Sequence, residues 1–156
     1  MRSGAPSIGT WMSMAQPSKA EILAMAGYEW VVIETEHTAI VVSEVIRLII
    51  AIDQRGSVPI VRLAWNDPIQ AKAVLDSGAA GVHVTKINTK ADAELAVQMT
   101  KYLPLLSRGV VPARPQRYGE HFDAYLQMPS LTHCFSCKSN IGKPLTTYNE
   151  SYQWRA

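Results

Sequence analysis

Two spacings of apolar residues alternate along the first hundred residues of the chain. Short apolar runs rich in β-branched residues, such as Trp30–Ile33 and Val58–Leu63, predict buried strands. Between these runs, apolar residues recur at helical spacing, most clearly over about 42–54. The expected strands cover 7–12, 30–33, 58–63 and 81–84, and the expected helices begin near 18, 42, 67 and 89. This alternation predicts an α/β fold with a parallel sheet and crossover helices.

Capping signals mark three of the four helix starts. A side-chain oxygen at the N-cap satisfies a backbone N–H of the first turn, and a Glu or Gln three residues later can complete the box. The expected capping residues are Ser18 with Glu21, Asp67 with Gln70, and Asn88 or Thr89. Pro68 follows Asp67, at the position where helices tolerate proline best.

Two architectures fit this pattern, a (β/α)₈ barrel and an open doubly wound sheet. No glycine-rich phosphate motif follows the first strand, which weakens the dinucleotide-binding form of the open sheet. A whole barrel takes about 250 residues, whereas this chain supplies four clear βα units. After about Met128 the periodicity is lost. We therefore expect a partial barrel domain over 1–128 and an irregular tail over 129–156.

Composition excludes several classes of protein. The net charge is +2 with both signs interspersed, which gives no sign of a nucleic-acid or membrane partner. The longest apolar run is interrupted by Arg47 and bounded by Asp53, so it is too short and too charged for a transmembrane span. With two cysteines and no secretory pattern, we expect a cytoplasmic location. Cys134 and Cys137 form one CxxC pair, which is weak evidence for zinc because structural sites need four ligands.

Charged residues follow the second strand directly. Glu34, Glu36 and His37 come after the apolar run, where parallel α/β folds place their chemistry. His37 is the first candidate for a catalytic base because a histidine pKa lies near working pH. The alternative is that these residues form a solvated loop.

Several motifs together resemble those of one enzyme family. They are Ile8-Gly9-Thr10-Trp11, the segment from Gly27 to His37, Val61-Arg62 with Trp65-Asn66-Asp67-Pro68, Leu75-Asp76-Ser77-Gly78-Ala79, Arg108-Gly109, and Arg114-x-x-Arg117-Tyr118-Gly119. In this order and spacing they resemble the HpcH/HpaI aldolase family, over about residues 7–127. The resemblance implies a (β/α)₈ barrel, usually in an oligomer, that cleaves a 4-hydroxy-2-oxo acid to pyruvate and an aldehyde. It also implies a divalent metal (Mg, Mn or Co) that stabilises the pyruvate enolate.

The resemblance assigns roles to five residues. His37 matches the family's catalytic histidine, and Arg62 matches the arginine that binds the 2-oxo acid and stabilises the enolate oxygen. Asp76 matches the aspartate paired with the histidine, although it falls at a helix end, towards the opposite side from the strand ends. Either the helix boundary differs or a neighbouring subunit supplies Asp76. Trp11 and Glu36 would line the substrate site, with core packing the alternative for Trp11.

The chain departs from the family at three places. Glu34-Thr35-Glu36-His37 stands where Asp-Gly-Glu-His is usual, and Thr35 would be strained if the position needs a positive φ. Lys86 puts a cation where the family commonly has methionine. No position matches the family's Glu and Asp metal ligands, so we expect little metal affinity from this chain.

Two hypotheses follow from these observations. The first is a class II carbon–carbon lyase acting on a small 2-oxo acid and an aldehyde, with the chain impaired by truncation. The second is a non-catalytic binding or assembly subunit, or a degenerate paralogue. The expected protein partner is a further copy of the chain or a full-length relative.

Overall fold

In the computed structural model, the structure describes residues 6–100, 112–120, 134–137 and 146–148. The elements in chain order are β1 (Gly9–Met12), α1 (Pro17–Met25), β2 (Trp30–Glu34), α2 (Val42–Asp53), β3 (Val58–Arg62), α3 (Pro68–Asp76), β4 (Gly81–Val84), α4 (Lys90–Gln98), the 3₁₀ segment η1 (Arg114–Gly119), β5 (Cys134–Cys137) and β6 (Thr146–Tyr148). The first eight are four consecutive βα units, as the hydrophobic pattern predicts. The expected boundary at 128/129 lies outside the described residues.

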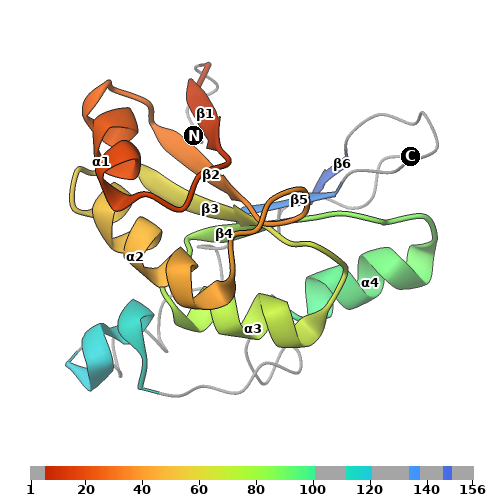
Figure 1. The fold of residues 1–156 in the computed structure, drawn as a ribbon. Coiled ribbons are helices and arrows are strands. Elements are labelled where there is room, and N and C mark those ends of the chain that lie inside the picture. The colour runs from red at the N-terminus through yellow and green to blue at the C-terminus, as the bar shows by residue number, and fades with distance from the viewer. Residues whose placement is uncertain (1–5, 101–111, 121–133, 138–145, 149–156) are drawn as a thin grey trace.

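The strands form one sheet in the order β1-β2-β3-β4-β5-β6. The first five run parallel to their neighbours, and β6 pairs antiparallel with β5. Helices α1 to α4 lie on the same face of this sheet (Figure 1). Consecutive parallel strands joined by helices on one face are the arrangement of a (β/α)₈ barrel wall, whereas a doubly wound sheet carries helices on both faces. The predicted barrel-type fold class is therefore confirmed.

The core lies between the sheet and the helices. Residues of the helix-side face of the strands, including Val31, Ile33, Val61 and Val82, are fully buried. They pack with the apolar stripe of α2, whose members are Val45, Leu48, Ile49 and Ile52, all 0% exposed. Burial of this continuous layer is the main stabilising contribution to the fold. None of the described helices is long and apolar enough to cross a membrane.

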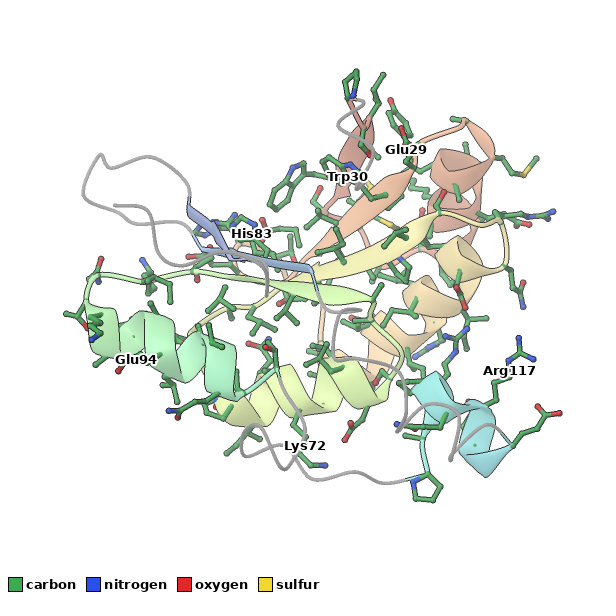
Figure 2. All side chains as sticks on the ribbon, turned by 180° about the vertical axis from the view of Figure 1, so that it is seen from behind. Glu29, Trp30, Lys72, His83, Glu94 and Arg117 are labelled. Atoms are coloured by element: carbon green, nitrogen blue, oxygen red, sulfur yellow. The ribbon has the colours of Figure 1, made fainter. Side chains whose placement is uncertain are left out.

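Period-two alternation sends the remaining strand residues to the other face. Val32 and Glu34 of β2, Arg62 of β3 and His83 of β4 share this open face, since Glu34 is in register with Arg62 and Arg62 with His83. Figure 2 shows His83 on the side of the sheet away from the helices, with Lys72 of α3 on the opposite side. The open face thus ends in a polar layer at the carboxyl edge of the sheet.

The helix starts agree only in part with the capping signals. Asp67 caps α3 as predicted, accepting from the N–H groups of Ile69 (2.9 Å) and Gln70 (3.3 Å), and Thr89 caps α4 with Asp92 completing the box. The prediction for Ser18 is wrong, because Pro17 begins α1 and Gln16 is the N-cap. With proline at the first helical position, the N-cap lies two residues earlier than expected, and Ser18 falls inside the first turn.

The expectation of an irregular tail is wrong for two segments. Cys134–Cys137 extends the sheet by pairing with β4, from Gly81↔Cys134 to Val84↔Cys137. Thr146–Tyr148 then pairs with it in the antiparallel direction. Strands of four and three residues are too short for a periodic signal, and a sheet edge can recruit them through backbone hydrogen bonds alone.

Candidate functional site

An ion-pair cluster lies at the carboxyl ends of β2 and β3. Arg62 is the last residue of β3 and is in register with Glu34, the last residue of β2. The Nη1 atom of Arg62 lies 2.6 Å from Oε2 of Glu34, and its Nη2 atom contacts Glu36. The three side chains are 15%, 11% and 8% exposed, so the charges are held with little access to water. Such pairs are shorter and stronger than neutral hydrogen bonds.

A tight turn after β2 brings Glu36 to this arginine. The Oε1 atom of Glu34 accepts from the backbone N–H groups of Glu36 (2.7 Å) and His37 (3.3 Å). The hydroxyl of Thr38 donates to the carbonyl of Glu34 at 2.5 Å, which closes the turn from its far end. Glu34 therefore both pairs with Arg62 and folds the segment that presents Glu36 and His37.

Burial and hydrogen bonding act in opposite directions on Glu34. Burial alone would raise the pKa of this carboxyl, but the hydrogen bond from Arg62 and the N–H groups of Glu36 and His37 lower its pKa below the ordinary value. The carboxylate form is therefore the one this environment stabilises.

Thr35 fits the position where the family usually has glycine. Thr35 is not among the described residues with a positive φ, so the site does not require glycine here. Its side chain is buried, donates to the carbonyl of Arg62 (2.5 Å) and accepts from Nε2 of Gln70 (3.2 Å). The substitution supplies two hydrogen bonds that connect β2, β3 and α3.

His37 lies at the solvent side of the cluster. Its side chain is 70% exposed, and its Nε2 atom lies 3.6 Å from Oε2 of Glu36. The imidazole is the most exposed of the candidate groups in this cluster and can meet a ligand that approaches from solvent.

Trp11 and His83 lie beside the Arg62 cluster on the open face of the sheet. The guanidinium carbon of Arg62 lies 5.6 Å from the centroid of the Trp11 ring, within the range of a cation–π interaction. The ring of His83 meets Trp11 nearly edge-on, with centroids 5.6 Å apart and an interplanar angle of 73°. Trp11 is 48% exposed, so it borders the Arg62 cluster and is not packed in the core. No motif in the sequence points to His83, and its association with the cluster follows from its register with Arg62.

Asp76 lies apart from these residues in the described structure. It is the last residue of α3, and its carboxylate pairs with Lys72 on the same helix at 2.9 Å. The end of α3 leads to the amino end of β4, so Asp76 is at the opposite edge of the sheet from His37 and Arg62. One copy of the chain does not bring Asp76 to the cluster.

The described residues do not form a metal site. No group of three or more His, Cys, Asp or Glu side chains among them is arranged to hold a metal ion. Glu34 and Glu36 already pair with Arg62, which competes for their oxygens. The side chains of Cys134 and Cys137, the CxxC pair, lie outside the description.

Comparisons with known proteins agree on one family. The sequence model of the HpcH/HpaI aldolase/citrate lyase family matches residues 7–134. The 4-hydroxy-2-oxo-heptane-1,7-dioate aldolase of Klebsiella pneumoniae is 40% identical over 110 residues, covering 70% of this chain and 42% of that protein. The protein of the same name from Shigella sonnei is 38% identical, covering 86% of this chain and 52% of that protein. The chain thus spans about half the length of the curated relatives it matches.

Solved structures give the same result. An HpcH/HpaI aldolase/citrate lyase family protein from Burkholderia cenocepacia superposes with a TM-score of 0.79 at 32% identity, covering 87% of this chain and 56% of that chain. The citrate synthase SbnG superposes with a TM-score of 0.69 at 26% identity, covering 84% of this chain and 50% of that chain. The fold, the order of the motifs and the sequence match together show that the chain belongs to the HpcH/HpaI aldolase/citrate lyase family.

Proposed function

We propose that the chain carries the 2-oxo acid site of a carbon–carbon lyase that cleaves a 4-hydroxy-2-oxo acid to pyruvate and an aldehyde. The observation that carries this proposal is the Arg62 cluster at the carboxyl edge of the sheet, bordered by the exposed His37. The named aldolase relatives support the reaction type. Family membership supports the placement of the site at this edge.

Arg62 is the residue we assign to the substrate. Retro-aldol cleavage develops negative charge on the oxygen of the 2-oxo group, and a fixed guanidinium stabilises such charge. Two carboxylates pair with the guanidinium of Arg62, and the hydroxyl of Thr35 donates to the Arg62 carbonyl, so both ends of the residue are held in place. Its Nε atom is buried without a hydrogen-bond partner among the described residues, so its donor set is incomplete.

His37 is the residue we assign to proton transfer. Cleavage removes the proton of the 4-hydroxyl group as the carbon–carbon bond breaks, and the imidazole accepts it. The carboxylate of Glu36 beside its Nε2 atom orients the ring. Trp11, together with Glu36, lines the substrate site. These assignments follow the family motif residue by residue.

Charge in the cluster requires a further cation. Glu34 and Glu36 outweigh the single guanidinium of Arg62, so the cluster alone repels an anionic substrate. The HpcH/HpaI family is a group of metal-dependent class II aldolases, and a divalent ion (Mg, Mn or Co) would supply positive charge and polarise the 2-oxo group. Carboxylates from outside the described residues would have to hold it, and we assign no step of the reaction to it in this chain.

Asp76 acts, in this proposal, from a neighbouring copy of the chain. Its position at the opposite sheet edge leaves no route to His37 within one copy. Mixing two inactive variants, His37→Asn and Asp76→Asn, would then restore part of the activity, because mixed oligomers contain some sites with both native residues. Absence of restoration in a verified mixed oligomer would contradict the shared site.

Release of pyruvate from a 4-hydroxy-2-oxo acid tests the lyase proposal. We expect release by the purified chain with added Mg²⁺ or Mn²⁺ to fall at least about a hundredfold in His37→Asn. The unfolding midpoint of this variant should stay unchanged, because the side chain is 70% exposed. Equal release by the native chain and His37→Asn would count against the assignment.

We propose assembly as a second candidate function, favoured by an apolar patch at the β1 end of the sheet. β1 pairs with β2 on one side, and the described residues provide no strand on its other side. Three exposed apolar side chains line one pocket beside this edge: Trp11 (48%), Met14 (52%) and Ile22 (63%). Surfaces of this kind mark protein–protein contacts. Light scattering would show self-association that Ile22→Glu abolishes, while a monomeric native chain would contradict it.

A further inference from the structure

Lys86 occupies an unusual backbone position just after β4. Its φ is 61°, in the left-handed region that costs a non-glycine residue about 1–2 kcal/mol. The preceding Thr85 is 3% exposed and donates to the carbonyl of Leu63 at 3.4 Å, which fixes the loop against the end of β3. Strain of this kind persists where surrounding contacts hold it and is frequent at ligand-binding sites.

The left-handed turn directs the lysine over a tryptophan of the neighbouring loop. The ammonium of Lys86 lies 5.7 Å from the centroid of the Trp65 ring. Trp65 is 59% exposed and sits in a loop that Asn66 anchors through a hydrogen bond from its side chain to the carbonyl of Asp92 (2.9 Å). An aromatic face fixes the position of an ammonium without neutralising its charge.

No carboxylate within the described ranges pairs with Lys86. The ion pairs of the described residues involve other cations, such as Lys72 with Asp76 and Lys90 with Glu94. Lys86 is half-buried, which limits how far water can satisfy its charge. A half-buried, oriented ammonium with no acidic partner among the described residues can pair with an anionic ligand.

The position of Lys86 relative to Arg62 suggests which anion. Arg62 and His83 are register partners at the ends of β3 and β4. Trp65 belongs to the loop between β3 and α3, and Lys86 belongs to the loop between β4 and α4. Both loops leave the same edge of the sheet (Figure 1). Arg62 and Lys86 therefore lie at the same edge of the sheet, at the ends of two neighbouring strands, where one ligand with two acidic ends can meet both cations.

We propose that Lys86 binds the far carboxylate of a 2-oxo dicarboxylate whose 2-oxo acid end lies against Arg62. This inference rests on the proposed function and deepens it by making Lys86 the residue that selects a diacid over a monoacid. It also supplies part of the positive charge that the Arg62 cluster lacks. Because a ligand carboxylate can replace water around the ammonium while the Trp65 ring stays in place, binding needs no rearrangement of either loop.

A matched pair of ligands tests the selection. Binding of 2-oxoadipate and 2-oxohexanoate, which differ only in a terminal carboxylate or methyl group, is measured by calorimetry on the full chain with Mg²⁺ present. We expect the diacid to bind the native chain about tenfold more tightly, which is the effect of one good charged contact. In Lys86→Met the preference disappears while the affinity for 2-oxohexanoate is unchanged.

Two further variants separate a specificity role from a structural one. Lys86→Arg keeps the charge and should restore most of the preference, and Lys90→Met, at an exposed lysine of α4, should leave it unchanged. Arg62→Lys should weaken both ligands equally. A native preference that survives in Lys86→Met overturns the role of Lys86 alone. Failure of both ligands to bind overturns the proposed function together with this inference.

Discussion

Arg62 and Glu34 join the ends of two neighbouring parallel strands, with Nη1 of Arg62 2.6 Å from Oε2 of Glu34. The same carboxylate folds the following turn through the N–H groups of Glu36 and His37. A single side chain therefore positions both Arg62 and the backbone of His37. Changes at Glu34 should affect stability and site geometry together.

Stability should depend on pH through Glu34. We expect Glu34→Gln to lower the free energy of unfolding by about 2 kcal/mol at pH 7, since it loses charge-assisted hydrogen bonds. The pKa of Glu34 is lowered in the folded state. Its contribution is therefore complete above the unfolded carboxyl pKa of about 4.3 and is lost as pH falls through the lower folded pKa.

Urea unfolding of the native chain and Glu34→Gln at pH 7, 5, 4 and 3 measures this dependence. The difference between the two proteins should shrink below about pH 4. Glu94→Gln, at an exposed site on α4, serves as a control and should show almost no difference at any pH. If the difference in unfolding free energy between the native chain and Glu34→Gln stays constant down to pH 3, the stability does not depend on the ionisation of Glu34.

Thr35 should make the folded chain more stable than the glycine that is usual at this position in the family. Thr35→Gly removes the hydroxyl that bridges the Arg62 carbonyl and the Gln70 amide, and it adds backbone entropy to the unfolded chain. We expect a loss of about 1–3 kcal/mol in unfolding free energy. Thr35→Ser keeps the hydroxyl and should lose less. A Thr35→Gly protein as stable as the native chain would show that these hydrogen bonds contribute nothing.

Substitutions of Asp67 and of Ser18, which lie near the starts of α3 and α1, should differ in their effects on stability. Asp67→Ala removes the cap of α3 and should cost about 1 kcal/mol, whereas Asp67→Asn keeps an acceptor and should cost less. Ser18→Ala should change stability by less than about 0.5 kcal/mol, because Ser18 is inside the first turn of α1. Thermal unfolding of the three variants measures the differences, and equal losses at both positions would contradict the cap assignments.

Gly9 should tolerate no side chain. A Cβ at this position would lie 1.9 Å from Cδ2 of Trp30, its register partner on β2. Gly9→Ala should therefore displace the indole and cost about 1–3 kcal/mol, with a change in tryptophan fluorescence. Gly27→Ala, where φ is +91° and no atom lies within 4 Å, should lose stability through backbone strain without that spectral change. Identical spectra for Gly9→Ala and the native chain would contradict the close approach.

Local pattern was sufficient to predict the elements whose one face is buried. The β-branched run of β2 specifies a strand, and the apolar stripe of α2 specifies a helix. In each case, the spacing of the apolar residues places them together on a buried surface only in that conformation. The position of Asp76 at a helix end was also predictable, since Gly78, with a φ of 101°, ends α3 just after it. The role assigned to Asp76 remains a prediction.

Contacts between residues of different strands and loops could not be predicted from the sequence, because they depend on the register of the strands. The contacts of His83 with Trp11, and of Lys86 with Trp65, depend on how separate strands and loops align, and no local period encodes that alignment. β5 exists through its pairing with β4 rather than through a pattern of its own. The Ser18 prediction failed because the fixed φ of Pro17 moved the helix start.

Deuterium exchange into the methyl group of pyruvate tests the central proposal most directly, because it reports enolisation without requiring the aldehyde. Proton NMR would follow the methyl signal of pyruvate in D₂O with the native chain, His37→Asn and Lys90→Met, each with and without Mg²⁺ or Mn²⁺. We expect exchange above the protein-free rate for the native chain and Lys90→Met, and a large loss in His37→Asn at an unchanged unfolding midpoint. No exchange by a folded native chain, or equal exchange by His37→Asn, would contradict an enolising site at the Arg62 cluster.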